Sequence, residues 1–269
     1  MNVAVVYLIC YALRVFEYFL LRTDRTWVGE AIIHKLIGIG ILLVAAKLLQ
    51  ITMSDVGFVK KNGLRSLGKG LAFGLGMFTL AYAVEIVLAM AGGHFDSLQV
   101  YVSTYAVDQN IGHQTSILFF AICIVGNIVN VVMEEGIFRG LFQKLLEKKH
   151  SFMSAAVMAS TLFGLWHVVG PIRNFVDGTS SMEGMIANAI MLCVTSALVG
   201  FKLALLTRMT GSLYMGMGDH FVNNTIVNIL HVVSGTGADE MMFVRITIAQ
   251  SVSFFLVLFY YICQRRKQR

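Results

Sequence analysis

Three groups of polar residues interrupt long apolar stretches of this 269-residue sequence, and their side chains are of the kinds that acid–base chemistry uses. The groups are Glu134 and Glu135 with Arg139, then His167, then His220 with Asn224. A charged side chain at the centre of a membrane helix costs at least about 2.5–3.5 kcal/mol, so its presence needs a reason. Carboxylates and imidazoles are common general acids and bases. The combination suggests a hydrolytic site.

The spacing within the first and third groups indicates different roles on a helix. Glu135 and Arg139 stand at i and i+4 with the acid first, which is the favourable order for an ion pair. Glu134 projects about 100° away from Glu135, so it is left without a partner on its own helix. A lone carboxylate in an apolar site holds its proton more tightly than one in water and suits general acid–base work. His220 and Asn224 share one helix face.

Each group also has a structural interpretation. The two glutamates and Arg139 can act as a buried ion-pair cluster that only joins helices. A single histidine on an apolar helix, such as His167, is more often a hydrogen-bonded core residue than a catalyst. The remaining charges in apolar segments are expected to be structural. They are Arg14 paired with Glu17, Lys47 reaching the membrane surface from a helix end, and His34, Lys35 and Glu85 as partners between helices.

These residues belong to apolar segments that predict a bundle of membrane-spanning helices. Hydrophobic residues make up 57% of the chain and charged residues 13%, against about 25% charged in a soluble domain. A spanning helix needs about 20 mostly apolar residues. Such segments lie at residues 3–22, 31–53, 70–92, 115–146, 152–170, 184–206, 211–233 and 242–263. We therefore expect an all-α, polytopic membrane protein with about eight transmembrane helices, in which residues 1–269 form a single membrane domain.

The expected helices place the polar groups at one depth. The fourth and fifth segments form a hairpin with a basic tip at residues 148–151, and both Glu134 and His167 lie roughly 25 Å from that turn. Antiparallel packing then brings these two residues to the same level. His220 lies in the seventh segment, which starts from the same side of the membrane. Three helices therefore direct polar side chains toward one buried level.

Loop charges predict the orientation. One set of loops holds most of the cations, namely Lys60, Lys61, Arg65, Lys69, Lys144, Lys148, Lys149, Lys202, Arg208, Arg265, Arg266, Lys267 and Arg269. The alternate loops hold only Arg22, Arg25 and Arg173, and stretches 94–114 and 234–241 have no Lys or Arg. By the positive-inside rule both termini are cytoplasmic, in the plasma membrane if the cell is bacterial. The net charge of +6 thus informs topology and does not indicate a nucleic-acid partner.

The three groups together resemble the motifs of the type II CAAX prenyl protease family, also called the CAAX-protease and bacteriocin-processing or Abi family. Its pattern is EExxxR, then FxxxH, then HxxxN or HxxxD, on separate transmembrane helices. Here the pattern is followed within residues 115–225 by Glu134-Glu135 with Arg139, by Phe163 with His167, and by His220 with Asn224.

The resemblance implies an intramembrane peptidase with an eight-helix fold. It implies that Glu134 is the catalytic glutamate, that His167, His220 and Asn224 are the other catalytic residues, and that Glu135 and Arg139 support them. Members of this family include enzymes that cut after a prenylated cysteine and bacterial proteins with other substrates. The resemblance therefore identifies the reaction class better than the substrate.

Other classes of membrane protein have less support. The HExxH motif of site-2 metalloproteases and the Gly-x-Ser-Gly motif of rhomboid-type enzymes are absent. Gly216-Met217-Gly218-Asp219 matches the GxGD motif of presenilin-like aspartyl proteases, but that chemistry needs a second carboxylate, and we interpret the glycines as sites of close helix packing. The non-enzymatic alternative is a transporter, or an immunity or scaffold protein, in which the same residues form a proton or cation path.

The hypothesis from the sequence is an intramembrane endopeptidase that acts on a hydrophobic or lipidated peptide or membrane-protein substrate among the membrane lipids. Glu134 would activate a water molecule, His167 would orient it, and His220 with Asn224 would stabilise the oxyanion. No cofactor is favoured, because zinc bound to Glu134, His167 and His220 would leave the site without a free base. These three residues are nevertheless the expected ligands if the enzyme proves to be a zinc metalloprotease.

Overall fold

The computed structural model describes residues 2–26, 28–103 and 113–267, most of which are helical. The elements in chain order are α1 (Val3–Phe16), η1 (Glu17–Leu21), η2 (Thr23–Arg25), α2 (Ile33–Leu48), α3 (Met53–Val56), α4 (Gly63–Ala91), β1 (Phe95–Val100), α5 (Ile117–Glu134), η3 (Glu135–Phe142), α6 (Gln143–Glu147), α7 (Phe152–Trp166), α8 (Val169–Val176), α9 (Met182–Thr210), α10 (Tyr214–Ile229), β2 (Leu230–Ser234) and α11 (Met242–Lys267). The expectation of an all-α polytopic membrane protein is confirmed. The small antiparallel sheet of β1 and β2 is an addition that the hydrophobic pattern does not predict.

Serine residues set where three of the long helices begin. Ser116, Ser151 and Ser181 precede α5, α7 and α9, and each side-chain oxygen accepts a hydrogen bond from a backbone N–H of the first turn. Such caps satisfy donors that a helix N-terminus leaves without an intrahelical partner. The segments predicted to start at residues 115, 152 and 184 therefore begin within two residues of the observed helices.

Among the described residues, six helical stretches are long and apolar enough to cross a membrane. They are Val3–Arg25, Gly63–Ala91, Ile117–Glu147, Phe152–Val176, Met182–Thr210 and Met242–Lys267. Large apolar side chains on their outer faces are exposed, among them Leu20, Val87, Ile190 and Phe259. Soluble proteins keep exposed apolar patches small, whereas a bilayer accepts an apolar surface around helices whose backbone groups are paired internally. The chain is an integral membrane protein.

The expected count of eight spanning helices is not confirmed. The two remaining segments correspond to α2 and α10, which have 16 residues each. A helix of that length measures about 24 Å, short of the roughly 30 Å of a hydrocarbon core. The segment predicted to reach residue 233 is cut short because the chain becomes extended at Leu230 and pairs with β1.

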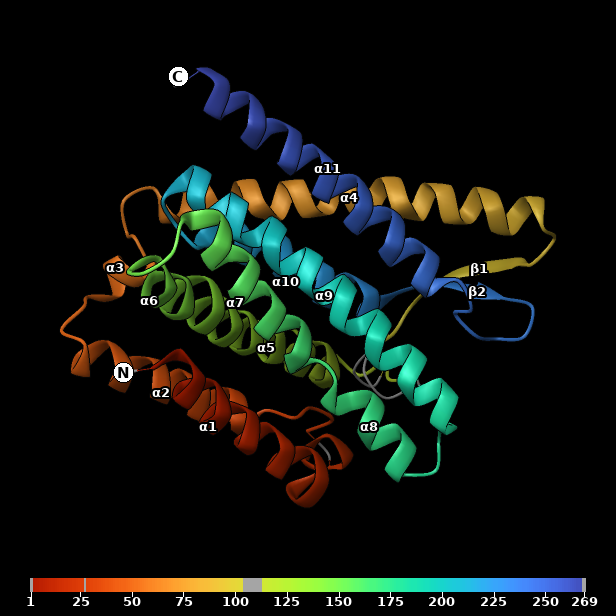
Figure 1. The fold of residues 1–269 in the computed structure, drawn as a ribbon. Helices are drawn as coiled ribbons and strands as arrows, with labels where there is room; N and C mark the ends of the chain where they lie inside the picture. Colours follow the sequence, from red (N-terminus) through yellow and green to blue (C-terminus); the bar gives the residue numbers. More distant parts are fainter. Residues whose placement is uncertain (1, 27, 104–112, 268–269) are drawn as a thin grey trace.

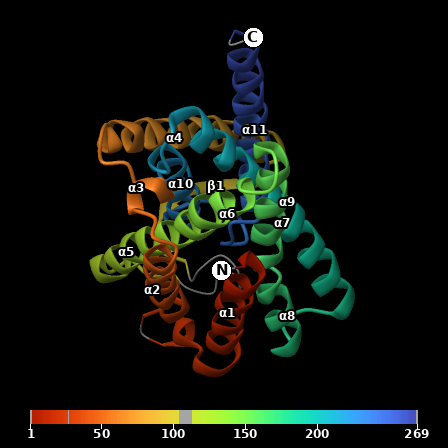
Figure 2. The ribbon, with the colours of Figure 1, turned by 60° about the vertical axis from the view of Figure 1, so that its left-hand side comes forward.

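The helices run back and forth between two ends of the molecule (Figure 1). Both termini lie at one end, together with α3 and the turn that follows α6, while β1 and β2 lie at the other end. Most loops that the sequence analysis assigns to one side of the membrane thus share one end. Figure 2 shows α5 and α6 between the pair α1 and α2 and the pair α4 and α11. Residues 104–112 of the predicted loop 94–114 lie outside the described residues.

Two glycines allow α4 and α10 to approach closely. A Cβ atom on Gly70 would overlap the carbonyl oxygen of Met215, and one on Gly218 would lie 2.6 Å from the carbonyl oxygen of Leu67. The interpretation of the GxGD glycines as sites of close packing is therefore confirmed for Gly218. Gly216 is different, since a Cβ atom there would meet only ordinary contacts at 3.7 Å.

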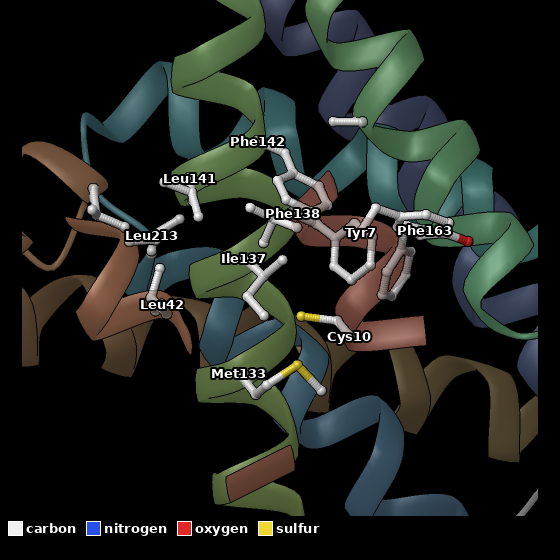
Figure 3. Close-up of a cluster of buried hydrophobic side chains, with 14 of the residues drawn as sticks. Tyr7, Cys10, Leu42, Met133, Ile137, Phe138, Leu141, Phe142, Phe163 and Leu213 are labelled. Carbon is white, nitrogen blue, oxygen red and sulfur yellow. The ribbon is translucent and has the colours of Figure 1, made fainter. Parts of the chain in front are cut away.

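A cluster of apolar side chains packs beside the two glutamates and holds their backbone in place. Figure 3 shows its members from α1, α2, α5, η3 and α7 with Leu213, which are Tyr7, Cys10, Leu42, Met133, Ile137, Phe138, Leu141, Phe142, Phe163 and Leu213. The ring of Phe138 meets Phe163 edge-on at 5.1 Å and Trp166 at 5.7 Å between centroids. Close packing of this kind leaves little freedom to the elements that carry the polar groups.

The end that carries the sheet is held by a buried charge network. Nη1 of Arg245 on α11 donates to both carboxylate oxygens of Glu85 on α4, at 2.8 and 3.0 Å. Nη2 of Arg245 lies 2.6 Å from Asp239, whose Oδ2 also contacts Nδ1 of His231 at 3.0 Å. Glu85 is thus a partner between helices, as expected from the sequence.

The predicted ion pair between Arg14 and Glu17 is wrong. Within the described ranges no ion pair joins them. The Glu17 carboxylate instead accepts hydrogen bonds from the backbone N–H groups at the start of α2 and from Nδ1 of His34. Free N–H groups at a helix N-terminus attract a carboxylate, and spacing along one helix cannot reveal such a partner. Arg14 is directed to Glu134, with 3.9 Å between Nη1 and Oε1.

Two cations that were expected in loops are buried in helices. Lys202 lies within α9 with its Nζ 2.6 Å from Oδ2 of Asp219, and Arg173 lies within α8 paired with two aspartates. A cation can lie buried within a helix, away from the membrane surface, when a nearby carboxylate compensates its charge. Lys35 pairs with Glu30 in the loop before its own helix, and so its partner does not come from another helix.

Replacing Gly70 with alanine is expected to destabilise the protein, because the added Cβ would overlap the backbone of α10. Overpacking of this kind costs about 1–3 kcal/mol. Gly68→Ala is the matched control on the same helix, since nothing lies within 4 Å of a Cβ atom there. This control should not destabilise the protein, because alanine is about 1 kcal/mol more favourable than glycine inside a helix. Thermal unfolding of both variants in detergent measures the difference. Equal melting temperatures would contradict the close approach of α4 and α10.

Candidate active site

The carboxylate of Glu134 lies where four helices meet. Its Oε1 accepts a hydrogen bond from Nε1 of Trp166 at 2.9 Å, and its Oε2 accepts one from Nδ2 of Asn130 at 3.1 Å. Nε2 of His220 lies 3.5 Å from Oε2, and Nη1 of Arg14 lies 3.9 Å from Oε1. The whole residue is 2% exposed. The expectation that Glu134 is a lone carboxylate in an apolar site is therefore wrong, because donors and a cation from α1, α5, α7 and α10 compensate its charge.

Glu135 contacts the imidazole of His220 at Nδ1, the ring nitrogen that does not face Glu134. Nδ1 of His220 lies 2.8 Å from Oε1 of Glu135, and the same oxygen lies 3.0 Å from Nη2 of Arg139. The guanidinium of Arg139 stacks over the ring of Phe163 at 3.9 Å. The ion pair expected between Glu135 and Arg139 is thus present. Glu135, which is held by Arg139, orients the imidazole of His220 so that its Nε2 is directed to Glu134.

The two adjacent glutamates face different nitrogen atoms of His220, and the helix changes its winding between them. The regular helix α5 ends at Glu134, and the π-helical turn η3 begins at Glu135. Single π-helical turns inside α-helices often occur at functional sites. Gly136 and Gly140 let neighbouring side chains approach this turn, because a Cβ atom at either position would lie 2.5 Å from a side chain of α2 or α3. The turn is therefore closely enclosed on that side.

His167 follows the last residue of α7 and is adjacent to Trp166, the indole that donates to Glu134. Its Nδ1 lies 2.8 Å from the carbonyl oxygen of Phe163, and its ring packs edge-on against that side chain at 4.7 Å. A carbonyl oxygen only accepts, so Nδ1 carries the proton in this hydrogen bond. In the neutral ring, Nε2 then has a free lone pair that can accept a hydrogen bond from water.

Asn224 lies one helical turn beyond His220 and is hydrogen-bonded to neighbours on α10. Its Oδ1 accepts from Nδ2 of Asn223 at 2.9 Å, and its backbone oxygen accepts from Nδ2 of Asn228 at 2.8 Å. Within the described part of the chain no hydrogen bond joins its side chain to Glu134 or to His220. Of the residues singled out from the sequence, Asn224 thus stands apart from the cluster around Glu134.

Three partners of Glu134 are not predicted from the sequence. Asn130 stands four residues before it, and this i, i+4 spacing is a signal that one helix alone contains. Trp166 is adjacent to His167 in the sequence, but its indole N–H could only be placed once α5 and α7 were packed together. Arg14 comes from α1, far along the chain, with its guanidinium 4.6 Å from the ring of Trp166.

The side chains around Glu134 do not fit a metal ion in this arrangement. Over residues 2–26, 28–103 and 113–267, no three His, Cys, Asp or Glu side chains form a group that could hold one. Both oxygens of Glu134 already accept hydrogen bonds from N–H groups, one from Trp166 and one from Asn130. The set of Glu134, His167 and His220 is therefore not arranged as the three protein ligands that catalytic zinc takes.

Asp219 of the GxGD match is not placed as half of an aspartic protease pair. Its carboxylate lies 2.6 Å from the ammonium of Lys202, where an aspartic protease would need a second carboxylate that shares a proton. This contact supports a structural role for Asp219.

Residues 116–226 match the family model described as type II CAAX prenyl endopeptidase, Rce1-like. The matched segment begins at the cap of α5 and ends within α10, so it includes Glu134, Glu135, Arg139, His167, His220 and Asn224. The resemblance that the three motifs indicate is confirmed over these residues. No curated protein matches the chain.

Proposed function

We propose that this protein is an intramembrane endopeptidase that hydrolyses a peptide bond of a hydrophobic or lipidated substrate. The observation that carries the proposal is the contact of one imidazole with both glutamates of the EExxxR motif. His220 lies 3.5 Å from Glu134 through Nε2 and 2.8 Å from Glu135 through Nδ1. This arrangement lies inside the segment that matches a family of prenyl endopeptidases. Acid–base residues held against one another in this way suit the activation of water.

In the proposed reaction Glu134 is the general base. It takes a proton from a water molecule as the water oxygen attacks the carbonyl carbon, and it later gives this proton to the departing amine nitrogen. Each carboxylate oxygen has two lone pairs, so Glu134 keeps capacity for water beside the bonds from Trp166 and Asn130. The free lone pair on Nε2 of His167 accepts the other hydrogen of the water molecule and orients it.

The oxyanion of the tetrahedral intermediate is assigned to His220 and Asn224. When the ring of His220 carries both protons, Nδ1–H stays on Glu135, and Nε2–H, which faces Oε2 of Glu134 at 3.5 Å, donates to the oxyanion once the oxyanion forms beside Glu134. Asn224 supplies an amide N–H from the next turn of α10. Donors that are already oriented before the charge develops contribute more to catalysis than donors that must reorganise. Glu135 and Arg139 act as positioning residues that keep the imidazole in place.

The location of the site supports a hydrophobic or lipidated substrate. Glu134 and His220 are buried among helices that cross the membrane, so a scissile bond must be brought below the membrane surface to reach them. A prenyl chain or an apolar peptide enters hydrocarbon at low cost, whereas a polar peptide does not. The matched family is named for prenylated substrates, and this supports a lipidated cysteine as the first substrate class to test.

Cleavage is proposed to depend on Glu134, and Glu134→Gln is the sharpest test because it keeps the size of the side chain and removes the base. We expect cleavage to fall by at least about 10²-fold, the usual contribution of a general base. Glu135→Gln is the matched control, since it keeps a hydrogen-bond acceptor for His220 and should retain partial activity. The probe is a quenched fluorescent peptide with a farnesylated cysteine four residues from its C-terminus, assayed in detergent beside its unprenylated form.

Full activity of Glu134→Gln would refute the mechanism. A wild-type protein that cleaves neither probe, and that leaves the membrane proteome of cells unchanged relative to Glu134→Ala, would favour the transporter or scaffold alternative. Cleavage of the unprenylated probe alone would keep the reaction class and reject the lipidated substrate.

We further propose that the reaction needs no tightly bound metal ion. The donor set supports this, because Glu134 is engaged by Trp166 and Asn130 and is still required as the base. Activity is expected to survive treatment with a strong chelator, with less than one metal ion per chain by elemental analysis. The opposite result, in which stoichiometric zinc is present and activity is lost on its removal and restored on its return, would make Glu134, His167 and His220 the ligands.

Both termini are proposed to be cytoplasmic, because the end of the molecule that carries them also carries most of the loop cations. Reporter fusions after residues 60 and 149 should report the cytoplasm, and a fusion after residue 238 should report the outside. A fusion after residue 149 that reports the outside of the cell would show that the proposed orientation is wrong. The basic turn after α6 would then lie on the side that the positive-inside rule disfavours.

A further inference from the structure

A chain of hydrogen bonds begins at the buried ammonium of Lys202 and ends at the side chain of Asn224. Nζ of Lys202 donates to Oε1 of Gln250 at 2.8 Å, and Nε2 of Gln250 donates to Oδ1 of Asn223 at 2.7 Å. Nδ2 of Asn223 then donates to Oδ1 of Asn224 at 2.9 Å. Three helices, α9, α11 and α10, contribute to this chain, and Gln250 lies beyond the segment that matches the endopeptidase family.

The direction of the chain is set by its first member. An ammonium only donates, so the group of Gln250 that faces Lys202 must be its carbonyl oxygen. The amide N–H of Gln250 therefore points to Asn223, whose own amide must then present oxygen to Gln250 and N–H to Asn224. The last step engages the oxygen of Asn224 and leaves its NH₂ group free of any hydrogen bond within the described ranges. Without a fixed donor at the start, each amide has a second orientation with oxygen and nitrogen exchanged.

The ammonium itself has no freedom to turn away. Its three N–H groups have three partners, which are Oδ2 of Asp219 at 2.6 Å, Oε1 of Gln250 at 2.8 Å and Oγ of Ser253 at 3.0 Å. Lys202 is 1% exposed, so water does not compete for these bonds. Consecutive hydrogen bonds in one direction also polarise one another. The positive charge at one end therefore strengthens the donor at the other.

From this geometry we infer that Lys202, Gln250 and Asn223 are positioning residues that orient Asn224, so that its amide presents N–H to the reacting carbonyl oxygen. The inference rests on the proposed function, in which Asn224 is an oxyanion donor. It explains why a lysine is buried in α9 and why two adjacent amides follow His220 on α10. A carbonyl oxygen presented by Asn224 would repel the oxyanion, so the orientation of this amide decides whether it assists the reaction.

Two substitutions on α11 separate this role from packing. Gln250→Met keeps the size and flexibility of the side chain but breaks the chain between Lys202 and Asn223. Ser253→Ala is the matched control, because it removes another acceptor of the same ammonium, one that does not lead to Asn224. Both are measured with the farnesylated quenched peptide, using the full-length protein in detergent, and their thermal unfolding is compared.

We expect Gln250→Met to lower kcat about tenfold with KM unchanged, which is part of the roughly 10²–10³-fold effect of removing an oxyanion donor outright. Ser253→Ala should leave kcat unchanged. In an Asn224→Ala background, Gln250→Met should have no further effect, because the residue through which it acts is absent. Equal tenfold losses in both backgrounds, or equal losses in the two α11 variants, would overturn the inference and leave only a packing role.

The failure of this inference is distinct from failure of the proposed function. Cleavage that is unaffected by Glu134→Gln and by Asn224→Ala rejects the assigned mechanism, and with it the role of the three positioning residues. Cleavage that is lost with Glu134→Gln and reduced with Asn224→Ala, but with independent effects of Gln250→Met, keeps the mechanism and rejects only the orientation of Asn224 through Gln250.

Discussion

The burial of ionised side chains among apolar helices is the constraint on which the rest of this molecule depends. An isolated charge in such surroundings is so costly that it must be paired, and removal of one partner leaves the other uncompensated. Glu134 is surrounded by Arg14, Trp166, Asn130 and His220, and Glu135 by Arg139 and His220. Because Arg14, Trp166 and His220 come from three other helices, satisfying the charges also determines how the helices pack.

The same constraint connects the site to parts of the chain outside the matched segment. Arg14 links the N-terminal helix α1 to Glu134, and Gln250 links the C-terminal helix α11 to Asn223. At the sheet end, Arg245 joins α11 to α4 through Glu85. The segment that carries the motifs is therefore one part of a larger polar arrangement. The flanking helices supply polar partners for Glu134 and Asn223 as well as apolar surface on the outside of the molecule.

Close packing and a change of helical winding make this arrangement possible. Gly70 and Gly218 bring the backbones of α4 and α10 together, and this closeness positions the helix that carries His220 and Asn224. The π-helical turn that begins at Glu135 directs two consecutive carboxylates to opposite sides of one imidazole. Large side chains at the two glycine positions would hold the backbones of α4 and α10 several ångströms further apart.

The sequence by itself determined the membrane class, the helical architecture and the three polar groups, because hydrophobic length and residue spacing are local properties. The Glu135–Arg139 pair followed for the same reason, since both residues lie on one helix. Only the tertiary structure decided that Arg14 faces Glu134 and that Lys202 is buried against Asp219. A charge in hydrocarbon must have a partner. Which residue becomes that partner depends on how helices from distant parts of the chain pack together, so spacing within one segment cannot predict it.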